Sequence, residues 1–244
     1  MLGITTFDRS ITLFLNRFAD VDPAFDHFVL DIANSALVNG GLFMAYFWWL
    51  WFKNDERTTE RRRSVLVSIF GALLAVLVSR ILQLALPFHD RPLHMPDLGF
   101  VLPSGVNANA LSHWNSFPSD HAVLFFALTT AIWYESRRVG YIAALWTFFV
   151  ICLSRIYLGY HFPSDILGGM ILGVALMIGV RFFLRNARWP MRLLNWSTLH
   201  QTAFYCVAFL ASYEITILFY DLRALSVDGF HIVKSMIIAS AWAR

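Results

Sequence analysis

The chain is built from long apolar runs separated by short polar segments. Six of these runs approach the roughly 20 apolar residues that a helix needs to cross a bilayer. No internal repeat or low-complexity tract interrupts the series, so the pattern predicts a single all-α, polytopic membrane bundle of six transmembrane helices. The runs cover residues 35–52, 64–86, 120–135, 140–158, 163–184 and 202–220.

The segments that flank this core are expected to lie at the membrane interface. In residues 1–34, apolar side chains form an imperfect helical stripe before a break at Pro23, which is typical of a helix lying along the membrane surface. Such a helix could pack on the core or act as a lid or lipid gate, and packing is the favoured alternative. Residues 221–244 contain too few apolar residues to span, so we expect an interfacial tail helix at the outer face. The whole chain, 1–244, is thus treated as one integral membrane domain with its six-helix core at 35–220.

Composition agrees with a membrane protein. Of the 244 residues, 58% are hydrophobic and only 14% are charged, which is too apolar for a soluble domain of this length. Cys152 and Cys206 both fall inside apolar runs, which argues against a disulfide framework and against a thiolate metal cluster. The net charge of +3 could indicate a nucleic-acid partner, but the basic residues lie in loops between apolar runs, so membrane topology explains them better and no nucleic acid is expected.

Basic residues are divided unevenly between the two sets of loops. The loops at 53–63, 137–138 and 181–192 together carry eleven Lys or Arg residues, whereas the opposite set, with both termini, carries six. Cytoplasmic loops are enriched in Lys and Arg. We therefore expect both termini and the long, Pro- and Gly-containing loop at 87–117 to lie on the outer face.

Ionisable residues cluster at the outer ends of the second to fifth apolar runs. Such groups are costly at membrane depth and tend to be functional. Two arginines, two histidines and an aspartate brought together by four helices would make a phosphoryl-transfer site. The clustered residues are Arg80, Asp90, Arg91, Asp120, His121, Arg155, His161 and Asp165.

Two kinds of phosphate-binding group are available in this cluster. The planar, permanently charged guanidinium groups of Arg91 and Arg155 match the oxygens of a phosphate. Ser119, Asp120 and His121 follow Pro118 and open the third run, so the free backbone N–H groups of that helix start, including that of Asp120, can bind an anion.

The spacing of His161 and Asp165 indicates a nucleophile. The two residues are four positions apart at the start of the fifth run, one helical turn from each other. A carboxylate that accepts a hydrogen bond from one ring nitrogen fixes the tautomer and leaves the other nitrogen free to attack. His121 can then serve as the acid that protonates the leaving oxygen.

Three motifs in this order resemble the signatures of the type 2 phosphatidic acid phosphatase superfamily. They are Arg91-Pro92, then Pro118-Ser119-Asp120-His121, then Ser154-Arg155 followed after five residues by His161 and after three more by Asp165. The resemblance covers residues from about 35 to 184. It implies a six-helix fold shared with lipid phosphatases and vanadium-dependent haloperoxidases, with a phosphohistidine on His161, Asp165 as its partner and His121 as the acid. It further implies that Arg91, Ser119 and Arg155 hold the phosphate without a metal or other cofactor.

The sequence departs from the family pattern at two positions. Leu84 stands where the family has a lysine seven residues before the arginine, so one phosphate ligand is missing from its usual place. Arg80, one helical turn earlier, could replace it, or could instead extend to the interface or pair with an acidic neighbour. Asp120 stands where the family commonly has glycine, and because its carboxylate would repel phosphate, we expect it to point away and complement the helix N-terminus.

The resemblance implies a lipid phosphate as substrate and favours undecaprenyl diphosphate at the outer, periplasmic face of a bacterial inner membrane. A phosphatidylglycerophosphate or phosphatidic acid phosphatase, a lipid phosphotransferase, and a non-catalytic transporter or scaffold remain as alternatives. His89, His94 and His113 in the outer loop have no spacing that organises a metal site, so no metal is expected. The oligomeric state is left open.

Overall fold

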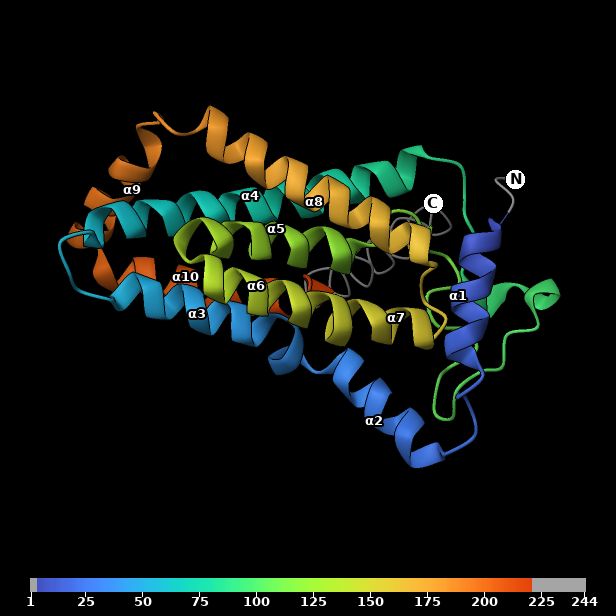
Figure 1. Cartoon of the computed structure of the whole chain (residues 1–244). Helices are drawn as coiled ribbons and strands as arrows, with labels where there is room; N and C mark the ends of the chain where they lie inside the picture. Colours follow the sequence, from blue (N-terminus) through green and yellow to red (C-terminus); the bar gives the residue numbers. More distant parts are fainter. Residues whose placement is uncertain (1–3, 221–244) are drawn as a thin grey trace, which may run out of the picture.

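The computed structural model describes residues 4–220, and these residues form an all-helical bundle without a β-strand (Figure 1). Most helices run side by side along the long axis of the molecule, and α1 lies across one end. The predicted tail helix at 221–244 lies outside the described residues. The α-helices are α1 (Thr6–Asn16), α2 (Pro23–Asn34), α3 (Leu42–Phe52), α4 (Thr58–Ala85), α5 (Asp120–Glu135), α6 (Arg137–Trp146), α7 (Leu153–Tyr157), α8 (Pro163–Phe183), α9 (Trp189–Leu199) and α10 (Gln201–Thr216).

Three helical segments within residues 4–220 are long and apolar enough to cross a membrane. They are α4, the continuous segment Arg137–Tyr157 that joins α6 to α7 through π-helical turns, and α8. Counting the pair Pro23–Asn34 and Leu37–Phe52, which is bent by 54°, as one broken span raises the number to four. The helical membrane character is confirmed, but the count of six is not, because α5 and α10 have only 16 residues each.

Helix α5 occupies the centre of the bundle, and its tight packing against α8 positions the candidate site. A side chain at Gly173 of α8 would place its Cβ 2.2 Å from the carbonyl oxygen of Val123, and one at Gly169 would come within 2.7 Å of the Ser119 carbonyl. Only glycine permits this approach of the two backbones. The starts of α5 and α8 are consequently side by side, and the Ser119 N–H donates to the Asp165 carbonyl over 3.2 Å.

Local sequence sets where these two helices begin. The hydroxyl of Ser119 accepts a hydrogen bond from the Ala122 N–H, which caps α5. Pro163 is the first residue of α8, where its fixed φ suits a helix start and its missing N–H is not needed. The turn before α8 contains Gly159 with a φ of +72°, a conformation that glycine adopts without strain. His161 therefore lies in the short segment between a tight turn and the start of α8.

The N-terminal helices pack on the end of the bundle that holds the candidate site. Asp8 of α1 accepts a hydrogen bond from the Ser164 N–H over 2.8 Å. Asp26 of α2 is fully buried and accepts from the Ser104 N–H over 2.8 Å and from the Tyr157 hydroxyl. These contacts support the packing alternative for this segment.

Candidate active site

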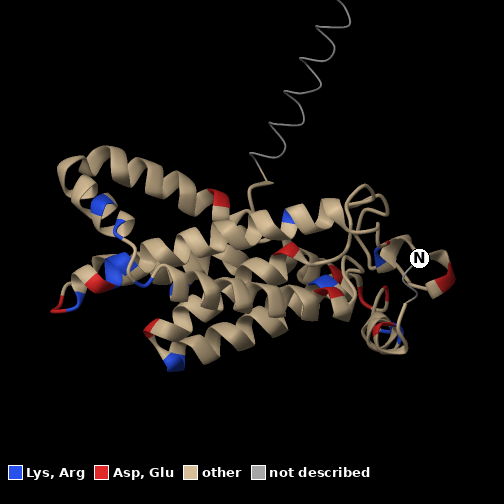
Figure 2. Cartoon of the chain, turned by 90° about the horizontal axis from the view of Figure 1, so that it is seen from above, with Lys and Arg blue, Asp and Glu red and all other residues tan. Residues whose placement is uncertain are grey.

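The sequence-predicted residues come together at one end of the bundle. Lys, Arg, Asp and Glu residues lie mostly towards the two ends of the molecule (Figure 2). At the end near α1, the loop between α4 and α5 supplies Arg91, α5 supplies His121, α7 supplies Arg155, and the turn before α8 supplies His161. Direct contacts join these residues in two pairs, Arg91 with His161 and Arg155 with His121.

The His161 ring is held in one tautomer. Its side chain is almost completely buried, and Nδ1 lies 3.0 Å from the backbone carbonyl oxygen of Ser116. A carbonyl can only accept, so Nδ1 carries the proton and Nε2 keeps its lone pair. Nε2 lies 3.4 Å from Nη1 of Arg91. The unprotonated nitrogen is thus directed at the side chain predicted to hold phosphate.

Asp165 supports His161 in a different way from the one expected. Its Oδ2 lies 3.7 Å from His161 Nδ1, which is longer than a hydrogen bond. The same oxygen accepts from the Ser116 hydroxyl over 2.6 Å and from the Phe162 N–H over 2.7 Å. Asp165 therefore holds Ser116, whose carbonyl is the closer partner of Nδ1, and adds a negative charge beside the ring.

Backbone carbonyls fix the guanidinium group of Arg91. Nη1 donates to the Tyr160 carbonyl, Nε donates to that of Trp114 over 3.3 Å, and Nη2 donates to that of Asn115 over 3.1 Å. Three of its five N–H groups are used in this way. The second N–H of Nη1 is on the side of His161 Nε2, and the second N–H of Nη2 has no acceptor among the described residues. Burial lowers the pKa of Arg91 from 12.5 to about 10, so the group still carries its charge at neutral pH.

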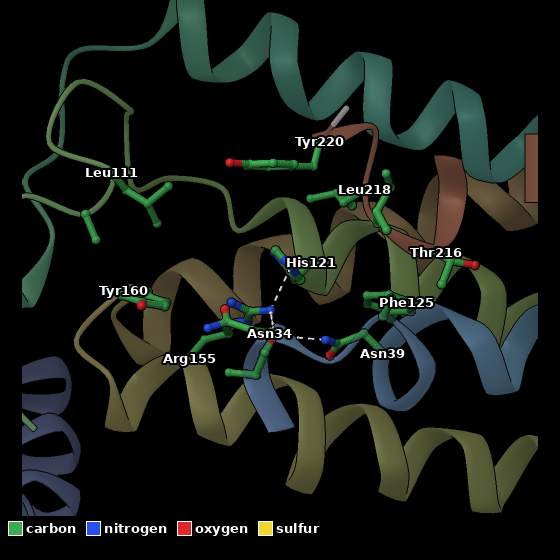
Figure 3. A pocket seen from close by; sticks show the side chains of 14 residues that line it. Asn34, Asn39, Leu111, His121, Phe125, Arg155, Tyr160, Thr216, Leu218 and Tyr220 are labelled. Carbon is green, nitrogen blue, oxygen red and sulfur yellow. Dashed lines mark hydrogen bonds between the residues drawn. The ribbon is translucent and has the colours of Figure 1, made fainter. Parts of the chain in front are cut away.

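His121 is held between an acid and an arginine. Its Nδ1 lies 3.0 Å from Oδ1 of Asp120, and its Nε2 lies 2.9 Å from Nη2 of Arg155. Figure 3 shows the contact between His121 and Arg155 at the wall of a cavity. Arg155 also donates to the Ala33 carbonyl, while its buried Nε has no acceptor among the described residues. This N–H is available to a phosphate oxygen.

Arg80 pairs with an acidic neighbour, which was one of the alternatives for this residue. Its guanidinium forms an ion pair with Oδ2 of Asp120 and donates to Gln83 Oε1 over 2.7 Å. Asp120 thus does not simply complement the helix start, as expected. It bridges Arg80 and His121, so both hydrogen-bond partners of the Arg80 side chain within residues 4–220 are protein groups, Asp120 and Gln83.

Two residues that sequence reasoning missed shape the loop before α5. Ser116 contacts both His161 and Asp165, as described above. Asn115 donates through Nδ2 to the Gln83 and Pro87 carbonyls and accepts from the His89 N–H over 3.1 Å. Both lie just before the Pro118 motif, but nothing in their spacing sets them apart from other polar loop residues.

A cavity of about 510 Å³ opens beside His121 and Arg155 (Figure 3). Its remaining wall is mainly apolar and aromatic, with Leu111, Phe125, Tyr160, Leu218 and Tyr220 among the lining residues. The polar lining residues are Asn34, Asn39, His121, Arg155 and Thr216. An apolar wall with a few polar groups, one of them a guanidinium, suits a molecule with an apolar tail and an anionic head. Within residues 4–220, no group of three or more His, Cys, Asp or Glu side chains is placed to hold a metal ion.

Comparisons with known proteins support the same family. Residues 88–189 match the model of the PAP2 superfamily. The chain is 28% identical over 141 residues to the bacitracin transport permease protein BcrC of Bacillus licheniformis, covering 54% of this chain and 62% of that protein. It is 29% identical over 161 residues to the undecaprenyl-diphosphatase BcrC of Bacillus subtilis (strain 168), covering 65% and 73%.

The chain spans less than two thirds of the length of the first of these relatives. A solved structure shares its fold. The crystal structure of Aquifex aeolicus LpxE matches with a TM-score of 0.51 at 21% identity, covering 74% of this chain and 98% of that chain. At this level of identity the likeness concerns the fold.

Proposed function

We propose that this chain, whose residues 88–189 match the model of the PAP2 superfamily, hydrolyses a terminal phosphate from a membrane lipid through a phosphohistidine intermediate. The observation that carries the proposal is the His161 ring, whose Nδ1 faces the Ser116 carbonyl while its Nε2 faces Arg91. An imidazole with one protonated and one free nitrogen beside a fixed cation is arranged to attack an anionic phosphorus.

The reaction proceeds in two steps. In the free protein His121 Nε2 accepts from Arg155, so His121 becomes the acid by taking up a proton on Nε2 when Arg155 turns to the substrate phosphate. Nε2 of His161 then attacks the terminal phosphorus in line, the bond from phosphorus to the leaving oxygen breaks, and His121 donates that proton to the leaving oxygen. Arg91 and Arg155 neutralise the charge that builds up on the phosphoryl oxygens. Water then attacks the phosphohistidine, giving inorganic phosphate and free His161, and His121 accepts the proton that the water loses.

We propose a polyprenyl diphosphate such as undecaprenyl diphosphate as the substrate. The relative from Bacillus subtilis is named for this activity, and the cavity beside His121 offers an apolar wall for a prenyl or acyl tail. The proposal includes six membrane crossings with the site at the outer face of a bacterial inner membrane, supported by the excess of basic residues in the opposite loops.

Phosphate release by the purified, full-length protein in detergent tests this proposal. With chelator present, we expect inorganic phosphate from undecaprenyl diphosphate, and slower release from phosphatidylglycerophosphate and phosphatidic acid. The assay is repeated with a lipid that carries an acceptor hydroxyl. Release without any acceptor supports hydrolysis, whereas phosphate that appears only on the acceptor lipid shows a transferase and contradicts the proposal.

The acid side of the pH profile follows from the environment of His161. Burial, and secondly the positive charge of Arg91, lower the pKa of this imidazole below 6.5. A lowered pKa keeps Nε2 unprotonated at more acidic pH, so activity is retained as the pH falls through 6.5 and is lost only below it. The measurement is kcat/KM against pH, with the ionisation of the substrate phosphate determined by phosphorus NMR and divided out. If activity already falls at or above pH 6.5 as the pH is lowered, the pKa of His161 is not lowered and the prediction is wrong.

A further inference from the structure

A second polar cavity of about 310 Å³ lies at the end of the bundle opposite to the candidate active site. The start of α4, the end of α5 and the end of α8 enclose it. Ser64 lines this cavity and Arg80 lies near the active site, 16 residues further along α4, which corresponds to roughly 24 Å at 1.5 Å per residue. The two cavities are therefore separate sites.

Positive charge exceeds negative charge on the wall of this cavity. Five arginines and two glutamates line it, which gives a formal balance of +3. One arginine, Arg61, is neutralised by a two-pronged pair with Asp55 over 2.6 and 2.7 Å. The charged lining residues are Arg57, Glu60, Arg61, Arg63, Glu135, Arg181 and Arg185.

The negative charge of Glu135 does not neutralise all the arginines of the cavity, because within residues 4–220 its carboxylate contacts only Ser64 and Arg181. It accepts from the Ser64 hydroxyl and lies 3.8 Å from Nη2 of Arg181. Arg181 also donates to Ser64 over 2.9 Å and lies over the Tyr134 ring. This network joins α4, α5 and α8 and forms a closed polar floor.

Two arginines on the outer part of the wall have no carboxylate partner within residues 4–220. Arg63 donates through Nη2 to the carbonyls of Leu184 and Arg185, which leaves its other N–H groups free. Arg185 is exposed, and its guanidinium lies over the Phe182 ring. Two uncompensated guanidinium groups above a polar floor are a receptor for a phosphate group.

We propose that this cavity binds the phosphate group of an anionic phospholipid, or a free phosphate ion, through Arg63 and Arg185. Basic pockets between membrane helices on the side rich in Lys and Arg are suited to anionic lipid head groups. Apolar side chains such as Phe182 and Phe183 are exposed next to Arg185, so acyl chains can lie beside the helix while the head group enters the cavity. The inference goes beyond the proposed catalysis and does not depend on it.

Native mass spectrometry of the full-length protein in detergent tests this site with short-chain phosphatidylglycerol, short-chain phosphatidylcholine and inorganic phosphate. We expect the double variant Arg63→Gln/Arg185→Gln to bind phosphatidylglycerol roughly 10-fold or more weakly than the unaltered protein. The variant loses charge-assisted hydrogen bonds to the phosphate, which are stronger than neutral ones, and this loss raises the Kd. Arg185→Gln alone is included because Arg185 makes no hydrogen bond to the helix end that Arg63 caps, so this variant keeps the fold.

The matched control is Arg137→Gln/Arg138→Gln, which removes two exposed arginines from the same end of the bundle but not from the cavity wall. Anion binding at the catalytic end is common to both double variants and cancels in the comparison. Selective loss with phosphatidylglycerol identifies a lipid site, and selective loss with inorganic phosphate alone identifies a soluble anion. Equal binding by both double variants, or equal binding of phosphatidylcholine, would overturn the proposal. Phosphate release by Arg185→Gln is expected to stay unchanged, which separates this site from catalysis.

Discussion

His161→Ala is expected to lower the rate of phosphate release by at least about 10⁴-fold, because no other group can form the phosphoenzyme in its place. The free Nε2 of His161 faces Arg91, whereas Nε2 of His121, the other histidine of the site, is engaged by Arg155. The change is measured as kcat for the purified protein and as loss of the acid-labile, phosphorus-labelled enzyme that a phosphohistidine would give. The substrate is still expected to bind, since both arginines remain.

The matched control for this variant is His113→Ala. His113 is a loop histidine on the same side of the molecule, and its side chain is exposed. Removing it should leave kcat within about twofold of the unaltered protein, as for surface substitutions away from a functional feature. Full activity in His161→Ala, with a normal thermal unfolding midpoint in both variants, would exclude the proposed nucleophile and with it the mechanism.

Much of the site could be predicted from the sequence because its residues stand at helix starts. Pro118 and Pro163 mark the beginnings of α5 and α8, and the chemistry of helix starts is enough to group Ser119, His121 and His161 at one end of the bundle. The apolar runs likewise indicated where helices lie. What they could not give is helix length, since α5 is short and is surrounded by other helices rather than by lipid.

The contacts that support the catalytic groups could not be predicted, because they depend on loop conformation. The sequence suggested that Asp165 accepts directly from the His161 ring, whereas the loop before α5 brings in the Ser116 carbonyl at 3.0 Å. A backbone carbonyl leaves no signature in residue type. Pairing of Arg80 with an acidic neighbour was one of the alternatives, but its partner could not be identified, because Arg80 and Asp120 are 40 positions apart and belong to different helices.

Arg80→Met is expected to lower kcat by roughly 10- to 100-fold with little change in KM. A general acid contributes about 10²–10⁴-fold to the rate, and the variant should lose only part of this because His121 itself remains. The structure places Arg80 against Asp120, and Asp120 against Nδ1 of His121. Without Arg80 the carboxylate loses its cation and no longer orients the His121 ring. We therefore expect Arg80 to act as a positioning residue, because removing a phosphate ligand would instead raise KM.

A double-mutant cycle separates these two roles. If Arg80 acts only through Asp120, the double variant Arg80→Met/Asp120→Asn has the same kcat as Asp120→Asn alone. If Arg80 binds phosphate, the two losses multiply. Leu84→Lys added to Arg80→Met provides a second test, because residue 84 is where the family carries a lysine and its exposed side chain lines the same cavity as Arg80. Rescue of KM by this lysine, or multiplying losses in the cycle, would show that a cation on this face of α4 contacts the substrate directly.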